Sequence, residues 1–202
     1  MYVYFSLGTN LGNKEQNLRL AVQYIEKRIG KVISLSAFYA TAPWGFSSDN
    51  AFLNAAVCIE TMLSPLEVLS ESQSIEREMG RIHKSVNGVY SDRVIDVDLL
   101  LYDDLILDTP TLKLPHPLMQ ERAFVMEPLA EIAPDVMHPV LGKNIQELYL
   151  GTFTKSGIYT RLLGNIYPMP WIYISSASDL YIQHIGYTSP INGVNISFVF
   201  DK

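Results

Sequence analysis

The chain has 202 residues, of which 48% are hydrophobic and 18% are charged. Enough apolar side chain is present to offset the entropy of ordering, so the composition excludes wholesale disorder, and the length fits one compact domain with an appended segment. The formal net charge of −6 is poorly suited to holding a nucleic-acid backbone. We therefore expect no nucleic-acid partner and only local contacts with any nucleotide.

The compartment is predicted from the cysteine count and the N-terminus. A single cysteine, Cys58, cannot form an internal disulfide, which favours a reducing cytoplasm. The N-terminal residues 1–6 lack the basic start and cleavage site of a signal peptide, and no uncharged apolar run reaches the ~20 residues that span a bilayer. The sequence therefore predicts a cytoplasmic protein with no membrane partner.

Strand and helix patterns alternate in the first part of the chain. β-Branched and aromatic residues over 2–7 predict a strand that ends in the turn-rich segment 8–13, whose glycines are interpreted as turn residues. Apolar residues at helical spacing predict a helix with Asn13 at its start and Gly30 at its end. The next predicted elements are a strand over 31–40, a loop over 41–50 and a strand over 51–61.

A second helix is predicted from a capping pattern. In Ser64-Pro65-Leu66-Glu67 a serine cap, a proline at the first helical position and a glutamate at the capping-box position start a helix that should end near Gly80. Later prolines allow only short helices, of which the most evident is 119–132 with a break at Glu127-Pro128. Between these helices we expect a polar loop over 82–92 and a strand over 93–102.

The order strand, helix, strand, strand, helix, strand is that of a ferredoxin-like fold. We therefore predict an α+β protein with a βαββαβ sheet and helices on one face, over residues 1–150. Residues 151–202 differ in character, because they are aromatic and carry a net charge of only +1. They are predicted to form a C-terminal β-rich or irregular extension of unknown role, with strands over 171–174, 180–187 and 196–200.

Two carboxylates stand out in the segment from Arg93 to Leu101. Because strand side chains alternate between faces, Asp96 and Asp98 point the same way, with their Cα atoms roughly 7 Å apart. Two like charges on a half-buried sheet repel one another unless a cation or solvent screens them, and hard oxygen ligands suit Mg²⁺. The alternative is the exposed polar face of an edge strand, which this pair alone does not exclude.

Several cationic side chains flank these carboxylates in the sequence. Arginine grips phosphate oxygens bidentately and lysine acts as a point charge, so a metal-polyphosphate clamp is one interpretation. Taken singly, Arg81 and Arg122 could instead be charges at helix C-termini, and Lys84 a solvated loop residue. The cationic candidates are Arg81, Lys84, Arg93, His116 and Arg122.

Other chemistries find little support. The segment 8–13 matches neither a Walker loop nor a dinucleotide fingerprint. Ser6 and Cys58 have no adjacent base of the triad type, which argues against covalent catalysis. The remaining histidines show no metal-ligand spacing, so a zinc site is not expected.

Five motifs in order resemble one family over about residues 1–150. The chain is similar to 6-hydroxymethyl-7,8-dihydropterin pyrophosphokinase, and the resemblance implies a ferredoxin-like fold and a role in folate biosynthesis. It also implies that ATP donates its β,γ-pyrophosphoryl group to the pterin hydroxymethyl oxygen, which leaves AMP. The motifs are Ser6-Leu7-Gly8-Thr9-Asn10-Leu11-Gly12, Phe52-Leu53-Asn54-Ala55-Ala56, Asp92-Arg93-Val94-Ile95-Asp96-Val97-Asp98-Leu99, Leu114-Pro115-His116-Pro117 and Arg122-Ala123-Phe124-Val125.

The resemblance also implies roles for individual residues. Asp96 and Asp98 would ligate two Mg²⁺ ions and, with Arg81 and Arg93, form the catalytic set. The residues implied for ATP as co-substrate are Lys84, Tyr90, His116 and Arg122. Those implied for the pterin are Thr41, Pro43, Trp44, Phe52, Asn54 and Phe124, with the two phenylalanine rings stacking on the flat heterocycle.

Departures from the family pattern and a second function class leave alternatives open. His83 stands where the family often has a second arginine, and Tyr90 where a tryptophan is common. Without the resemblance, Phe52 and Phe124 would be interpreted as ordinary core residues. The alternative function is a non-catalytic ferredoxin-like ligand-binding or regulatory module. For either function we expect a monomer whose partners are small molecules.

Overall fold

The structure is a computed structural model of the chain. It describes residues 1–42, 49–81, 92–153, 158–159, 173–176 and 179–181. The chain divides into two compact units, Met1–Tyr149 and Leu150–Lys202. Among the helices in the described ranges, none is both long and apolar enough to cross a membrane.

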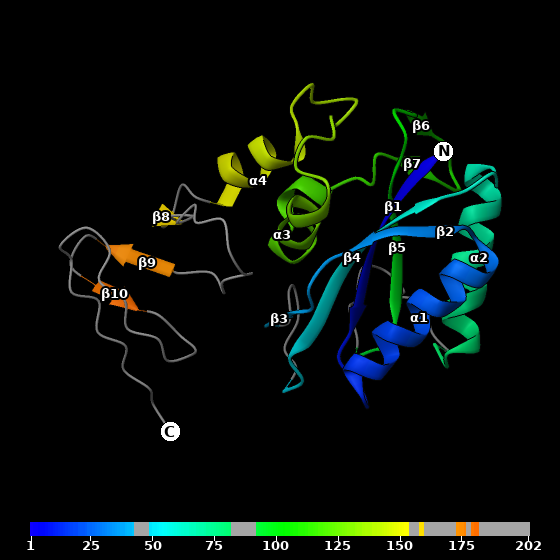
Figure 1. The fold of residues 1–202 in the computed structure, drawn as a ribbon, viewed down its shortest axis with the longest axis horizontal. Helices are drawn as coiled ribbons and strands as arrows, with labels where there is room; N and C mark the ends of the chain where they lie inside the picture. Colours follow the sequence, from blue (N-terminus) through cyan, green and yellow to red (C-terminus); the bar gives the residue numbers. More distant parts are fainter. Residues whose placement is uncertain (43–48, 82–91, 154–157, 160–172, 177–178, 182–202) are drawn as a thin grey trace. The chain divides into compact units, whose positions relative to one another are not determined.

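An antiparallel sheet forms the centre of the first unit (Figure 1). Its strand order is β2-β4-β1-β5, and the short strand β3 (Tyr39–Thr41) pairs with β4. The strands of the main path are β1 (Tyr2–Thr9), β2 (Lys31–Leu35), β4 (Phe52–Glu60) and β5 (Asp96–Tyr102). This order and the helices between the strands confirm the predicted ferredoxin-like α+β fold.

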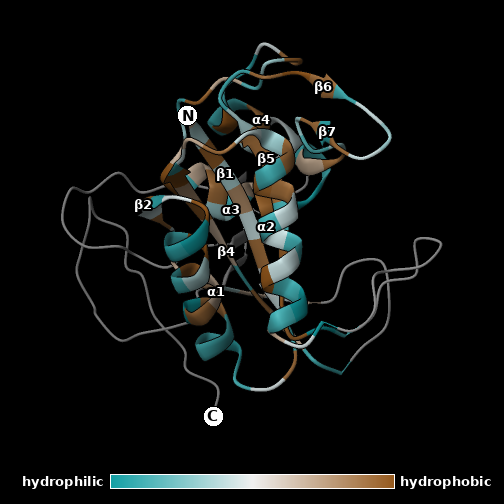
Figure 2. Ribbon diagram, turned by 90° about the vertical axis from the view of Figure 1, so that its right-hand side faces the viewer, coloured by the Kyte–Doolittle hydropathy of each residue, from teal (hydrophilic) through white to brown (hydrophobic). Residues whose placement is uncertain are grey.

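Helices α1 (Lys14–Arg28) and α2 (Pro65–Glu78) lie together on one face of this sheet (Figure 1). Figure 2 looks onto these two helices. Many of their residues are hydrophilic, whereas the strands behind them are largely hydrophobic. The core that they close contains Val3, Phe5, Leu7, Leu18, Ile25, Ile59, Val68, Ile75, Val97 and Leu99. The alternation of strand side chains therefore leaves the even-numbered residues of β1 for the opposite face.

Both helices begin as their capping residues predict. The Asn13 side chain accepts a hydrogen bond from the Gln16 amide at 3.1 Å. The Glu67 carboxylate accepts hydrogen bonds from the Ser64 amide at 2.8 Å and the Ser64 hydroxyl at 2.6 Å. Gly80, which follows α2, has a φ of 97°, a conformation that favours glycine.

The strands differ from the prediction in three places. The strand expected over 31–40 is divided into β2 and β3, because Ser36 between them bonds through its backbone and hydroxyl to Ala56. β1 continues through Gly8 to Thr9, so Gly8 is a strand residue and its interpretation as a turn residue is wrong. β5 begins at Asp96.

The opposite face of the sheet is covered in part by α3 (Ala123–Ile132), which packs on β4 and follows a 3-10 turn over Met119–Glu121. The predicted break at Glu127-Pro128 is wrong, since Pro128 lies inside a continuous helix. A proline in a helix loses one backbone hydrogen bond, and here complete burial of Met126 and Leu129 offsets that loss.

The remaining described elements are short. α4 (Ile145–Phe153) was not predicted, because proline and glycine precede it closely. In the second unit β9 (Tyr173–Ser176) and β10 (Asp179–Tyr181) overlap two of the predicted strands, and the strand predicted over 196–200 lies outside the described residues. The other strands are β6 (Leu107–Asp108), β7 (Lys113–Leu114) and β8 (Ile158–Tyr159).

Candidate active site

A cavity of about 200 Å³ lies where the sheet face opposite α1 and α2 meets the start of α3. Its floor is a row of residues across three strands, because Gly8 of β1 is paired with Asn54 of β4 on one side and with Asp96 of β5 on the other. The residues that line the cavity are Ser6, Gly8, Thr41, Ala42, Phe52, Asn54, Arg81, Arg93, Asp96, Asp98, His116, Arg122 and Phe124.

Asp96 and Asp98 project from β5 into this cavity. In the register of the sheet they lie opposite Gly8 and Ser6. The residues between and beside them, Ile95, Val97 and Leu99, are buried on the α1 and α2 side. The predicted common orientation of the two carboxylates is therefore confirmed. β5 is the last strand in the order of the sheet, but both carboxylates line the cavity, so the alternative of an exposed polar face is wrong.

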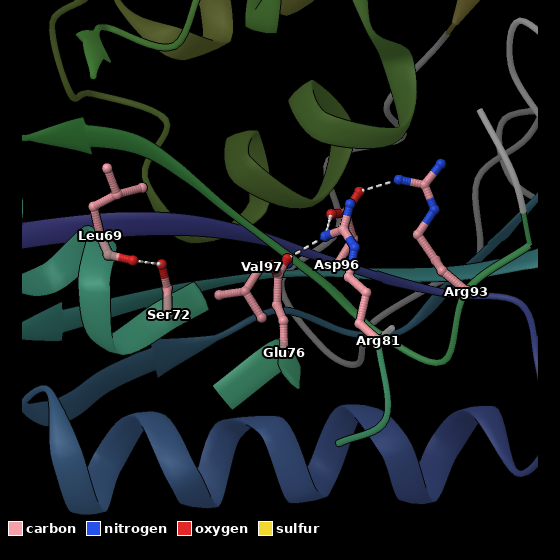
Figure 3. Close-up of polar contacts among 7 residues, drawn as sticks. All are labelled: Leu69, Ser72, Glu76, Arg81, Arg93, Asp96 and Val97. Carbon is pink, nitrogen blue, oxygen red and sulfur yellow. Dashed lines mark hydrogen bonds and ion pairs between the residues drawn. The ribbon is translucent and has the colours of Figure 1, made fainter. Parts of the chain in front are cut away.

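Two arginines hold Asp96 from either side (Figure 3). Arg81 Nη1 contacts Asp96 Oδ1 and also Glu76 Oε1, while Arg93 Nη1 contacts Asp96 Oδ2. The side chains of this group are all less than a fifth exposed. A charge-assisted pair in such surroundings is screened much less by water than a surface pair, so both arginines are fixed at the cavity wall.

Glu76 was not predicted from the sequence to belong to the site. It lies at the C-terminal end of α2, 6% exposed, and its Oε1 accepts a hydrogen bond at 2.8 Å from the Val97 amide of β5 (Figure 3). Burial raises the pKa of the Glu76 carboxyl, while Arg81 and the Val97 amide lower it. The one signal in the sequence is its position on the apolar stripe of α2 beside Ile75.

Asp98 lies close to two other carboxylates. The pKa of the Asp98 carboxyl is raised to about 7, chiefly by burial and also by the neighbouring carboxylates of Asp96 and Glu76. Arg122 and Arg81 have the opposite effect and lower it. A cation bound near the two aspartates would favour the ionised form of Asp98.

His116 and Arg122 come from the segment between β7 and α3. The His116 amide donates to the Leu100 carbonyl at 2.8 Å, which places the imidazole beside β5. Burial and the nearby Arg122 lower the pKa of His116. Arg122 is 9% exposed and stands between the end of the 3-10 turn Met119–Glu121 and the start of α3. It therefore does follow a short helical turn, as its alternative interpretation has it, and it also lines the cavity.

The other end of the cavity is aromatic and amidic. Phe52 at the start of β4 and Phe124 in the first turn of α3 are half-buried and line the cavity, so they are not residues of the closed core. The Asn54 amide nitrogen donates to the Thr41 hydroxyl at 2.8 Å. The Arg93 guanidinium lies 5.7 Å from the centre of the Phe52 ring, so the aromatic and charged ends are contiguous.

The donor set fits Mg²⁺ with oxygen ligands supplied in part by a substrate. Asp96 and Asp98 offer hard carboxylate oxygens in one cavity, and a bound cation would favour the ionised form of both. Within the described ranges, no group of three or more His, Cys, Asp or Glu side chains could hold a metal ion by itself. Phosphate oxygens and water would have to complete the coordination.

The structure brings together every predicted site residue that it describes. Pro43, Trp44, Lys84 and Tyr90 lie outside the described residues. Ser6, Gly8 and Ala42 line the cavity without having been predicted to do so. The residues brought together are Thr41, Phe52, Asn54, Arg81, Arg93, Asp96, Asp98, His116, Arg122 and Phe124.

Comparison with solved structures supports the fold. A Plasmodium falciparum HPPK-DHPS structure superimposes with a TM-score of 0.62 at 17% identity, and it covers 76% of this chain and 44% of that one. The chain therefore spans less than half of that solved protein. At this identity the likeness concerns the fold alone.

Comparison of sequences identifies the family. Residues 4–134 match the family model of 7,8-dihydro-6-hydroxymethylpterin-pyrophosphokinase. A 2-amino-4-hydroxy-6-hydroxymethyldihydropteridine pyrophosphokinase of Porphyromonas gingivalis is 47% identical over 138 residues, which are 68% of this chain and 93% of that protein. A protein of the same name from Methylorubrum extorquens is 42% identical over 77% of this chain and 95% of its own length. The chain is thus a pyrophosphokinase and belongs to the 7,8-dihydro-6-hydroxymethylpterin-pyrophosphokinase family.

Proposed function

We propose that the protein transfers pyrophosphate from ATP to 6-hydroxymethyl-7,8-dihydropterin with the help of Mg²⁺, giving AMP and the pterin diphosphate. The observation that carries this proposal is one cavity that joins two aromatic rings and an amide to a pair of carboxylates and several cations. The protein would act in the cytoplasm, as a monomer, on small-molecule substrates of folate biosynthesis.

The pterin end follows from the shape of the heterocycle. A flat bicyclic ring is held best by stacking on its faces and hydrogen bonding at its edge, so Phe52 and Phe124 would take the faces. The Asn54 amide nitrogen is already directed to Thr41, which fixes its orientation and leaves Oδ1 on the Gly8 side of the cavity. That oxygen can accept an N–H of the pterin edge.

The phosphate end follows from charge. Asp96 and Asp98 would hold Mg²⁺, which when bound neutralises phosphate charge and orients the pyrophosphoryl group. The Arg81 guanidinium contacts Asp96 and Glu76 through Nη1, so its other N–H groups can donate to phosphate oxygens, and Arg93 adds positive charge beside it. Arg122 extends this cationic wall toward α3, and the His116 imidazole, whose pKa is lowered, lines the cavity beside it. Transfer then depends on positioning and on charge neutralisation, without a covalent nucleophile.

An assay of the nucleotide product tests the proposal. The full chain with ATP, MgCl₂ and 6-hydroxymethyl-7,8-dihydropterin should form AMP, and EDTA should abolish its formation. Asp96→Asn and Asp98→Asn should each lower kcat by at least about 100-fold, since each removes a charge that would hold the metal. Circular dichroism should show both variants folded.

Two outcomes would contradict the proposal. Formation of ADP or inorganic phosphate would show that a different bond of ATP is cleaved. Binding of the pterin without any AMP would favour the alternative, a ligand-binding or regulatory module.

A further inference from the structure

A cluster of three polar side chains lies outside the cavity lining, beside Arg93. The Asp92 carboxylate accepts a hydrogen bond from Asn10 Nδ2 at 2.7 Å on Oδ1 and another from Asn50 Nδ2 at 2.9 Å on Oδ2. These residues come from three distant parts of the sequence. We call Asn10, Asn50 and Asp92 the Asp92 cluster.

On one side the cluster fixes the main chain of Arg93. Asn10 is 2% exposed, and its Oδ1 accepts the Arg93 amide at 2.7 Å. The backbone N–H of Asn10 in turn donates to the Arg93 carbonyl at 3.1 Å. Asn10 therefore contacts Arg93 through side chain and backbone while it donates to Asp92.

On the other side the cluster fixes the approach to Phe52. Asn50 stands two residues before Phe52, and Lys14 Nζ donates to the intervening Ala51 carbonyl at 2.9 Å. Asp92 thus joins the segment that leads into β4 to the segment that leads into β5. Each of these two segments leads directly to a residue of the cavity. Phe52 follows Asn50 by two residues, and Arg93 directly follows Asp92. The Arg93 guanidinium lies 5.7 Å from the centre of the Phe52 ring.

We propose that Asp92 is a positioning residue that sets the place of the Phe52 ring relative to the Arg93 guanidinium. The proposal rests on the function proposed above, in which Phe52 stacks on the pterin and Arg93 contacts phosphate. Because one carboxylate holds both segments, a change on the Asn50 side should also be felt at Arg93. A residue that served only the stability of β4 would not have this effect.

Exchange of donor and acceptor gives a sharp test. Asn50→Asp removes the Nδ2 group that donates to Asp92 and places a second carboxylate against the Asp92 carboxylate. Neither side chain of this pair then carries an amide that could rotate to restore the hydrogen bond. Adding Asp92→Asn to Asn50→Asp restores a donor opposite an acceptor, returns the net charge to that of the wild type, and keeps an oxygen for Asn10. Asn13→Asp is the matched control, since it makes the same substitution near the cluster at a helix cap that tolerates aspartate.

The expected result is a defect in both substrates that the exchange reverses. Asn50→Asp should raise the KM for the pterin and the KM for ATP by about threefold to tenfold each, which is the effect of one hydrogen bond. The double exchange should return both values to within about twofold of the wild type, and Asn13→Asp should stay within the same range. Melting temperatures should be similar for all four proteins.

Three outcomes would overturn the proposal. Asn50→Asp could leave both KM values unchanged, it could change the pterin value alone, or the double exchange could remain as impaired as the single variant. Formation of AMP by the wild type tests the proposed function independently of the role proposed for Asp92. If it yields no AMP, Kd values for Mg·ATP and the pterin, measured by calorimetry, replace the KM values and the same pattern is required.

Discussion

At the scale of single residues, Gly8 shows why the cavity floor is open. Its position in β1 places it between Asn54 and Asp96, and a Cβ there would lie 3.1 Å from Asn54 Oδ1. Such a contact is too close to be accommodated without moving the amide. The absence of a side chain at position 8 therefore preserves the orientation of the group proposed to recognise the pterin edge.

Gly8→Ala should thus impair the pterin end selectively. We expect the KM for the pterin to rise by about tenfold, because the displaced Asn54 oxygen loses one hydrogen bond to the substrate, while the KM for ATP changes little. Steady-state kinetics with each substrate varied in turn measures both. Gly151→Ala, where an added Cβ meets nothing within 4 Å, is the control. Equal changes in the two KM values would contradict this account of Gly8.

A second prediction at this scale concerns Glu127 in α3. Burial raises the pKa of its carboxyl to about 7 from an ordinary value of 4.5. The folded state therefore binds the proton more tightly than the unfolded state, so the stabilisation is complete below pH 4.5 and is lost as the pH rises through about 7. Glu127→Gln, which does not titrate, should equal the wild type at the acidic end and exceed it above neutrality by on the order of 1–3 kcal/mol.

Urea unfolding of both proteins across this pH range measures the difference. Since other groups titrate alike in the two proteins, their contributions cancel in the comparison. A stability difference that does not vary with pH would show that Glu127 has no raised pKa in the folded protein.

At the scale of elements, Glu76 joins the end of α2 to β5. Its carboxylate contacts Arg81 and accepts the Val97 amide, so the helix that covers one face of the sheet also holds an arginine of the cavity on the other face. The pair is almost fully buried, whereas Glu71 on the same helix pairs with Arg28 at a side-chain exposure of 36%. The two glutamates thus offer a buried and a surface ion pair for comparison.

Glu76→Ala should lower the free energy of unfolding by about 1–3 kcal/mol and raise the KM for ATP, because the buried Val97 amide loses its acceptor and Arg81 loses the side chain that fixes it at the cavity. Glu71→Ala should cost less than about 1 kcal/mol, as expected for an exposed pair, and leave the kinetics unchanged. Denaturant unfolding and steady-state kinetics test both variants. Equal costs for the two substitutions would mean that Glu76 acts as an ordinary surface charge.

At the scale of the whole molecule, the compact unit Met1–Tyr149 contains every described residue of the cavity. Relatives from Porphyromonas gingivalis and Methylorubrum extorquens match this chain over 93% and 95% of their own lengths, with alignments of 138 and 156 residues. The length that those proteins need is therefore close to that of the first unit.

A chain that ends after Phe153, at the end of α4, should keep the melting temperature and the kcat/KM of the full chain. This is expected because every core and cavity residue in the described ranges precedes this point. Thermal unfolding and the AMP assay compare the two proteins. A marked loss of activity with unchanged melting temperature would show instead that residues 154–202 take part in the reaction.

Elements with strong local signals can be predicted from the amino-acid sequence alone. Asn13 and the Ser64 capping box start α1 and α2, and the alternation around Asp96 and Asp98 orients both carboxylates. These features depend on neighbours within a few residues, so a local pattern is sufficient to predict them. The order of the elements then indicated the ferredoxin-like fold.

Contacts between distant segments, in contrast, become visible in the folded chain. Helix α3 continues through Pro128 because it packs on β4. Gly8 is part of the sheet because it pairs with strands on both sides. Glu76 and Arg81 come into contact when the chain folds. Each of these outcomes is set by partners far away in the chain, whose burial and charge outweigh the local preference of the residue. A pattern of neighbouring residues does not specify these partners, because they come into contact only in the folded chain.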